Sequence, residues 1–226
     1  MANRQARMGI IGGAGPMAGV LLFEKIIQIC QQKYGCSRDV DFPYVFLMNY
    51  PFGDMLTCER ESDLIENQLE ECFYCLFKNS VSVIAIACNT LHAFLPLQKE
   101  TFYLVHMIEE TGNFVREKGW ENPIVLCTST SAEARLHEQF FPCRYPKPSV
   151  QKEIDALIDR ILAGGCLQTL ANTFQALCED RPVIFGCTEL SLLNEKATLG
   201  LKNLCDPNSV VAEKMCEIIF NKREYL

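Results

Sequence analysis

Short, almost wholly apolar runs alternate with amphipathic stretches along this chain, and this alternation restricts its fold more than any other feature. Runs that are apolar from end to end are typical of parallel strands whose sheet is covered on both faces. The alternation therefore predicts an α/β fold with mainly parallel sheets flanked by helices. The predicted strands are residues 8–11, 44–48, 81–87, 103–106, 124–127 and 183–185.

The chain is predicted to form two similar α/β halves, residues 1–98 and 99–205, with a ligand site in the cleft between them. Each half runs through strand–helix units and ends on a strand that delivers a cysteine. No long Pro/Gly/Ser linker separates the halves. The amphipathic C-terminal segment, residues 206–226, is expected to pack back on the first half.

Charge and apolar patterning exclude two classes of partner. The formal net charge is −7 and the pI is near 5.1, and no basic stripe is visible, so a nucleic-acid partner is not expected. The apolar stretch at residues 8–23 imitates a signal peptide, but glycines and Pro16 break it and no cleavage site follows. No run reaches the length of a membrane span, so no membrane partner is expected.

The thirteen cysteines indicate a reduced cytoplasmic protein rather than a disulfide framework. Their number is odd, and the chain is too long for a fold held together mainly by disulfides. Cys72 and Cys75 form a C-x-x-C pair, but no second Cys/His pair lies nearby, so no metal site is expected. Most free cysteines act as small buried hydrophobes, and we interpret most of these thirteen that way.

Cys88 and Cys187 differ from the other cysteines because each directly follows a predicted strand and precedes polar residues. In open α/β sheets ligands bind beyond the carboxyl ends of the strands, so both thiols should face the cleft. A helix beginning there would lower the pKa of each thiol from about 8.5 toward neutrality. Two facing thiols can invert a stereocentre, because one removes a proton while the other supplies one.

Four patches, in order along the chain, resemble motifs of the aspartate/glutamate racemase superfamily, most of all its aspartate racemase branch. The resemblance implies a racemase that acts on the α-carbon of a small amino-acid substrate, with the two thiols as its acid and base and with no cofactor. The patches are the strand and glycine turn at 9–16, the first thiol segment at 87–92, the hydroxyl-rich segment at 126–131 and the second thiol segment at 186–190.

The resemblance also implies a set of substrate-binding residues that hold the α-carboxylate and the amino group. Taken alone, such Asn, Thr and Ser pairs are more often turns or caps. Glu189 would either join this set or cap the helix that it opens. The implied set is Gly13, Asn49, Asn89, Thr90, Thr128, Ser131 and Thr188.

The implied substrate is an acidic amino acid, with aspartate first. Aspartate-specific relatives carry an arginine after the second strand for the distal carboxylate, but Met55 stands at that place here. A thioether cannot pair with a carboxylate, so altered specificity is the alternative. Arg135, one helical turn beyond Ser131, is a candidate replacement for the missing arginine.

Other functions remain open at this point. The related two-cysteine families include hydantoin racemases, maleate isomerases and arylmalonate decarboxylases, and a binding protein without activity could use the same fold. Residues 13–18 fit a dinucleotide-binding G-x-G-x-x-A turn, but Pro16 removes a backbone N–H there, and the second strand ends in Met48-Asn49 rather than an acidic residue. A homodimer is expected only from the base rate for symmetric enzymes.

Overall fold

The computed structural model describes residues 6–53, 62–96, 102–177, 181–197, 201 and 203–221. It contains two sheets, in which every strand pair is parallel. The first sheet has the order β2-β1-β3-β4, with β1 (Arg7–Gly12), β2 (Tyr44–Asn49), β3 (Val83–Ile86) and β4 (Tyr103–Val105). The second has the order β5-β6-β7, with β5 (Ile124–Leu126), β6 (Val183–Phe185) and β7 (Leu204–Cys205).

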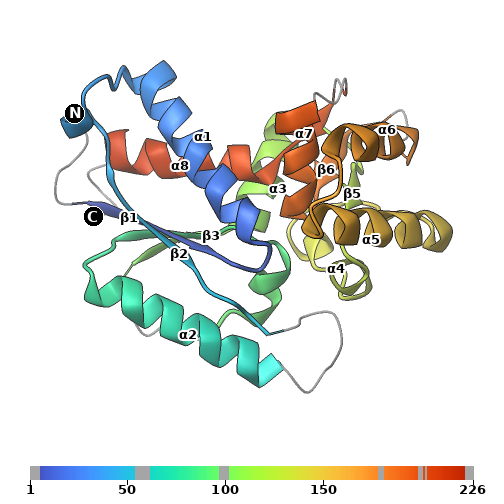
Figure 1. Cartoon of the computed structure of the whole chain (residues 1–226), viewed down its shortest axis with the longest axis horizontal. Helices are drawn as coiled ribbons and strands as arrows, with labels where there is room; N and C mark the ends of the chain where they lie inside the picture. The colour runs from blue at the N-terminus through green and yellow to red at the C-terminus, as the bar shows by residue number, and fades with distance from the viewer. Residues whose placement is uncertain are drawn as a thin grey trace.

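Helices cover the sheets, so the predicted α/β fold is confirmed (Figure 1). No helix in the described part of the chain is both long and apolar enough to cross a membrane. The α-helices are α1 (Pro16–Tyr34), α2 (Ser62–Lys78), α3 (Met107–Glu117), α4 (Ser129–Glu133), α5 (Pro148–Leu162), α6 (Leu167–Leu177), α7 (Ser191–Ala197) and α8 (Pro207–Asn221). Short 3-10 helices are η1 (Asp39–Asp41), η3 (Thr90–Phe94), η4 (His137–Gln139) and η5 (Thr188–Leu190).

The central strands of the first sheet, β1 and β3, are buried on both faces, which explains their uninterrupted apolar sequences. Successive side chains of a strand point to opposite faces. In β3, Val83 and Ala85 pack with α1 and α8, whereas Ile84 and Ile86 pack with α2 on the other face (Figure 1). A strand buried in this way has no polar face. Its residues are therefore all apolar, and successive residues differ only in which layer of helices they contact.

The second sheet is covered in the same manner by α5, α6 and α7 on one face and α3 on the other. Phe185 of β6 meets Phe174 of α6 edge to face, with ring centroids 5.5 Å apart. Ile184, the preceding residue, points the other way and packs with Ile108 of α3. The third strand of the second sheet, β7, has only two residues, which is too short for a sequence pattern to predict.

The predicted boundary at residue 98 is too early for β4. Residues 103–105 were assigned to the second half, but they pair in parallel with β3 and extend the first sheet. Nothing in an apolar three-residue run distinguishes the last strand of one sheet from the first of the next. At the other end of the chain, Met215 and Cys216 of α8 share a buried cluster with Leu22 and Ile26 of α1.

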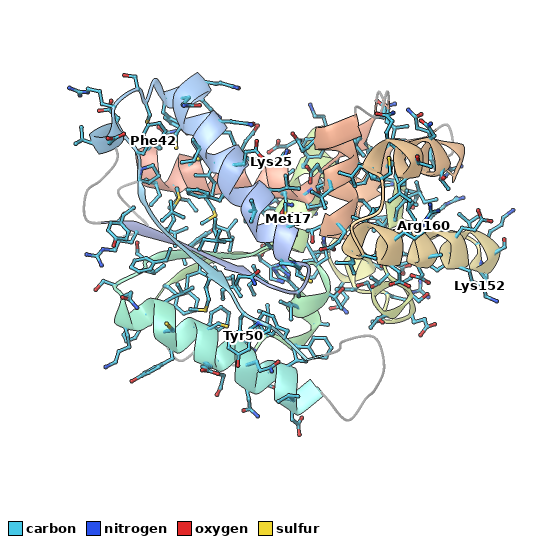
Figure 2. The ribbon with its side chains drawn as sticks, viewed as in Figure 1. Met17, Lys25, Phe42, Tyr50, Lys152 and Arg160 are labelled. Atoms are coloured by element: carbon cyan, nitrogen blue, oxygen red, sulfur yellow. The ribbon has the colours of Figure 1, made fainter. Side chains whose placement is uncertain are left out.

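A partly buried ion pair joins helices of the two sheets. Lys25 extends from α1 toward α7, where it pairs with Glu195, and its Nζ lies 3.4 Å from Asp206 Oδ2 (Figure 2). Burial lowers the pKa of Lys25, but the carboxylates of Asp206 and Glu195 outweigh it and raise the pKa. Ser191 Oγ donates to Asp206 Oδ1 at 2.7 Å, which holds that carboxylate in place. The pairing therefore opposes any separation of α1 from α7.

Candidate functional site

A cavity of about 220 Å³ lies where the carboxyl ends of the two sheets meet. Its lining comes from the residues that follow four strands: Gly13 after β1, Cys88 after β3, Thr128 after β5 and Cys187 after β6. This is the edge of a parallel sheet at which ligands bind in α/β proteins. Both strand-end thiols therefore face the same small space.

Of the catalytic and substrate-binding residues predicted from the sequence, most contribute to the lining of this cavity and two do not. Ser131 lies just behind the lining and is buried. Asn49 is exposed at the end of β2 and is absent from the lining. Of the residues predicted for the site, those that line the cavity are Gly13, Cys88, Asn89, Thr90, Thr128, Cys187 and Thr188.

The candidate replacement for the missing arginine, Arg135, does not supply a cation to the cavity. Met55 lies outside the described residues. Arg135 is exposed and forms an ion pair with Glu138, three residues along the chain. Arg135 is also absent from the lining, so it does not replace the arginine of aspartate-specific relatives.

Hydroxyl groups connect the two sheets at the cavity. Thr90 Oγ1 shares a hydrogen bond of 3.0 Å with Ser131 Oγ, to which Thr128 Oγ1 donates at 3.3 Å. Thr188 Oγ1 donates to the carbonyl oxygen of Ala87 at 3.2 Å. The Thr90–Ser131 and Thr188–Ala87 bonds each join a residue after a first-sheet strand to one after a second-sheet strand, so they hold the two strand edges together around the site.

Glu189, for which the sequence left a binding role and a capping role open, lines the cavity. Its side chain is only 5% exposed, and Cys187 Sγ donates to its Oε2 at 3.0 Å. Its Oε1 is buried without a hydrogen-bond partner among the described residues. Burial raises the pKa of this carboxyl. The sequence suggested a capping role as readily as a binding role, because position alone does not show where the carboxylate turns.

Both thiols have raised pKa values, so the predicted lowering is wrong for this site. Burial, followed by the charge of Glu189, raises the pKa of Cys88 to about 12. The same two causes raise the pKa of Cys187 well above its usual value. Backbone N–H groups of Leu91 and Thr90 oppose the shift at Cys88. Only short 3-10 helices follow the thiols, so their favourable field is smaller than the cost of burying a charge.

The glycine turn after β1 is shaped around Glu189. Gly15 has φ +82°, and a Cβ added to it would overlap Glu189 Oε1. A pyrophosphate held by this turn would have to share the space with that carboxylate, which carries the same sign of charge when ionised. The glycine at position 15 is therefore explained by the close approach of Glu189, and this disfavours a dinucleotide-binding role.

Gly15→Ala should destabilise the fold more than the matched substitution Gly35→Ala. Both glycines have positive φ, but nothing lies within 4 Å of a Cβ placed on Gly35. Gly35→Ala should cost about 1–2 kcal/mol of backbone strain, and Gly15→Ala about 1–3 kcal/mol more from overpacking against Glu189. Urea unfolding of the two variants measures the difference, and equal losses would contradict the contact.

One wall of the cavity is apolar. Phe52 precedes α2, while Ile158 and Leu162 lie near the end of α5, and all three contribute to the lining. No lysine or arginine occurs among the described residues that line the cavity. The sequence predicted α5 as an amphipathic helix, but its pattern could not show that the helix end reaches the site.

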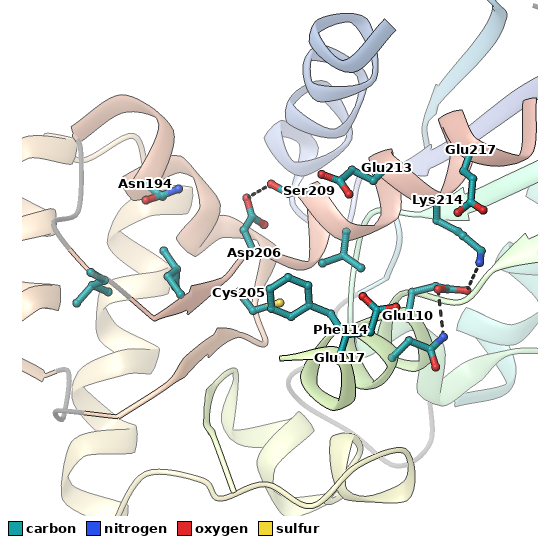
Figure 3. A pocket seen from close by; sticks show the side chains of 14 residues that line it. Glu110, Phe114, Glu117, Asn194, Cys205, Asp206, Ser209, Glu213, Lys214 and Glu217 are labelled. Carbon is teal, nitrogen blue, oxygen red and sulfur yellow. Dashed lines mark hydrogen bonds and ion pairs between the residues drawn. The ribbon is translucent and has the colours of Figure 1, made fainter. Parts of the chain in front are cut away.

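A larger cavity of about 440 Å³ lies elsewhere, between α3, β7 and α8 (Figure 3). Its walls are acidic, and Lys214 Nζ lies 3.8 Å from Glu110 Oε1. Its one cysteine, Cys205, is 1% exposed. Within the described ranges no group of three or more His, Cys, Asp or Glu side chains could hold a metal ion. The smaller cavity therefore carries the reactive groups.

Comparisons with known proteins identify the family of this chain. The family model described as "Asp/Glu/Hydantoin racemase" matches residues 11–215. The broad specificity amino-acid racemase RacX of Bacillus subtilis (strain 168) is 24% identical over 195 residues, which cover 81% of this chain and 86% of RacX.

Solved structures share the fold along the whole chain. The Picrophilus torridus aspartate racemase superposes with a TM-score of 0.75 at 19% identity, covering 97% of each chain. The glutamate racemase of Thermus thermophilus superposes with a TM-score of 0.60 at 16% identity, covering 95% of this chain and 80% of that one. Because the family model matches far more than half of its length, the chain belongs to the Asp/Glu/Hydantoin racemase family and is an amino-acid racemase, an isomerase.

Proposed function

We propose that this racemase inverts the α-carbon of an amino acid by two-base proton transfer, with Cys88 and Cys187 acting on opposite faces and no cofactor taking part. The observation that carries the proposal is that both thiols line one small cavity, with the buried carboxylate of Glu189 hydrogen-bonded to Cys187. A base on one face and an acid on the other are what inversion by proton transfer requires.

In the proposed reaction Glu189 is the group that generates the first thiolate. Its Oε2 accepts the proton of Cys187 Sγ along the existing hydrogen bond. The Cys187 thiolate then removes the α-proton, and the electron pair delocalises into the substrate carboxylate. The Cys88 thiol delivers its proton to the opposite face and becomes a thiolate. The enzyme now has a protonated Glu189 and a Cys88 thiolate, which is the form that acts on the opposite enantiomer.

The raised thiol pKa values serve this chemistry. An α-proton is a weak acid, and a thiolate whose conjugate acid has a high pKa is a stronger base toward it. The cost of forming such a thiolate is offset by Glu189, which takes the proton, and by the ammonium group of the substrate, whose positive charge favours a nearby thiolate. Burial of Cys88 and Cys187 thus makes their thiolates stronger bases. Substrate binding then restores the population of the thiolate form.

The lining supports a substrate with a neutral side chain. Phe52, Ile158 and Leu162 offer an apolar surface, and the described lining holds no cation for a distal carboxylate. Glu189 would repel such a carboxylate, and an unpaired buried charge costs several kcal/mol. The Bacillus subtilis relative is named for broad specificity. Aspartate, expected from the family likeness and from the Picrophilus relative, is the second candidate.

A panel of amino acids in deuterium oxide tests the substrate class. Loss of the α-proton signal in NMR should be fastest for neutral side chains such as leucine and methionine. For aspartate we expect kcat/KM to be at least about tenfold lower, because its side-chain carboxylate would lie unpaired. The double variant Cys88→Ser/Cys187→Ser corrects for background exchange. Exchange with aspartate and glutamate alone would instead assign an acidic substrate.

The proposed chemistry also bears on where the protein works and how it assembles. Two free thiols persist in a reducing compartment, which supports the expected cytoplasmic location. The cysteines in the described part of the chain are free. A homodimer is the assembly that base rates favour, and light scattering of the purified protein measures it.

A further inference from the structure

The side-chain amide of Asn89 is only half satisfied. Asn89 is 1% exposed and lines the cavity. Its Oδ1 lies 3.3 Å from Nε2 of His137, while its Nδ2 is buried with no hydrogen-bond partner among the described residues. A buried NH₂ group is costly to leave unpaired, so this group needs an acceptor. At the wall of a substrate cavity, that acceptor is the ligand.

The orientation of this amide depends on His137. If Nε2 of His137 carries the proton, it donates to Oδ1 and the NH₂ group of Asn89 turns to the cavity. If Nε2 is bare, the amide is expected to reverse, because NH₂ then donates to Nε2 and the carbonyl oxygen turns to the cavity. The first orientation attracts a carboxylate, whereas the second repels it. The tautomer of one buried imidazole thus decides the sign of the interaction.

Tyr145 selects the tautomer. The backbone N–H of His137 donates to the Tyr145 hydroxyl oxygen at 3.0 Å. The hydroxyl therefore keeps its own hydrogen for another acceptor, and Nδ1 of His137 lies 3.4 Å away. Cys143 also neighbours this hydroxyl, but sulfur is a weak acceptor compared with an imidazole nitrogen. With Nδ1 accepting, the single N–H of a neutral imidazole belongs to Nε2.

Burial keeps both partners in the required protonation states. It lowers the pKa of His137 to about 4, so the ring is neutral near pH 7. It raises the pKa of Tyr145 above its usual value, so the hydroxyl retains its hydrogen. Neither side chain lines the cavity, so both act through Asn89 rather than on the substrate.

We propose that Tyr145 and His137 are positioning residues: the hydrogen-bond chain from Tyr145 through His137 to Asn89 fixes the amide with its NH₂ group toward the α-carboxylate of the substrate. The inference rests on the proposed racemase function. It adds that two residues from the half of the molecule with the second sheet orient Asn89, which follows a strand of the first sheet and donates a hydrogen bond to the substrate carboxylate. The donor is then oriented before the substrate arrives, which lowers the cost of binding.

Imidazole NMR tests the chain without any turnover. The protein has three histidines, so the ¹⁵N-labelled rings can be assigned by single substitutions. We expect His137 to show a protonated Nε2 and a bare Nδ1, unchanged from about pH 6 to 8, where an ordinary histidine titrates. Tyr145→Phe should move population to the Nδ1–H tautomer. Tyr34→Phe, which removes a hydroxyl that accepts from Asn221, is the matched control and should change nothing. A wild-type ring protonated at Nδ1 would overturn the proposal.

A double-mutant cycle tests the consequence for binding. With the best substrate of the amino-acid panel, Asn89→Ala and His137→Phe should each raise KM by about tenfold or more, as for loss of a hydrogen bond to a charged group. The double variant should be little worse than either, because both remove the same interaction. Fully additive losses would refute the positioning role. If no amino acid is racemised, the proposed function fails, and the NMR result still decides the tautomer.

Discussion

Replacement of either Cys88 or Cys187 by serine should abolish racemisation, lowering the rate in both directions by about 10²–10⁴-fold. Each thiol serves one face of the α-carbon, and a serine hydroxyl is a far poorer base than a thiolate near pH 7. Chiral chromatography of reactions started from each enantiomer measures the loss. A rate near that of the wild type in either variant would contradict the two-base mechanism.

The two serine variants should nevertheless differ from one another. Each retains one competent thiol, which can still remove the α-proton from one enantiomer of an analogue with a β-leaving group, where no reprotonation is needed. Elimination from the D form should survive in one variant and from the L form in the other. The control is Cys127→Ala, because Cys127 is fully buried and absent from the cavity lining. Elimination from both enantiomers by a single remaining thiol would refute the assignment of one thiol to each face.

Glu189→Gln should lower racemisation by about 10²-fold or more, as expected for loss of a general base. The amide keeps the shape of the side chain but cannot take the proton of Cys187. Because the equilibrium constant between enantiomers is one, kcat/KM must fall equally in both directions. The effect on elimination should be more selective. Glu189→Gln should lose elimination only from the enantiomer that Cys187 deprotonates. This is the same enantiomer that the Cys88→Ser variant still processes.

The pH profile gives a second measurement of the same role. Glu189 must be ionised to accept a proton, and burial raises its pKa, so wild-type activity should be present above that raised pKa and fall as the pH drops through it. In Glu189→Gln this acidic limb should disappear, and the residual activity should rise with pH as Cys187 ionises. Glu110→Gln, which alters a carboxylate in the other cavity, should leave the profile unchanged. An unchanged acidic limb in Glu189→Gln would assign it to another group.

The sequence alone determined the architecture and the placement of the thiols. All six predicted strands form. A strand covered by helices on both faces is apolar along its whole length, so its signal lies in its own few residues and can be identified locally. Cys88 and Cys187 reach a common cavity because parallel strands place their carboxyl ends on the same edge, whatever the details of packing.

Tertiary structure decided the features that depend on neighbours distant in the chain. Three features are of this kind: β4 belongs to the first sheet, Glu189 turns toward Cys187, and His137 contacts Asn89. Each depends on pairing or packing that no local sequence pattern contains. The thiol pKa values show the same limit. Their position at helix starts predicts a decrease, but burial among both sheets and the Glu189 charge reverse it, since a pKa depends on every charge and dielectric boundary nearby.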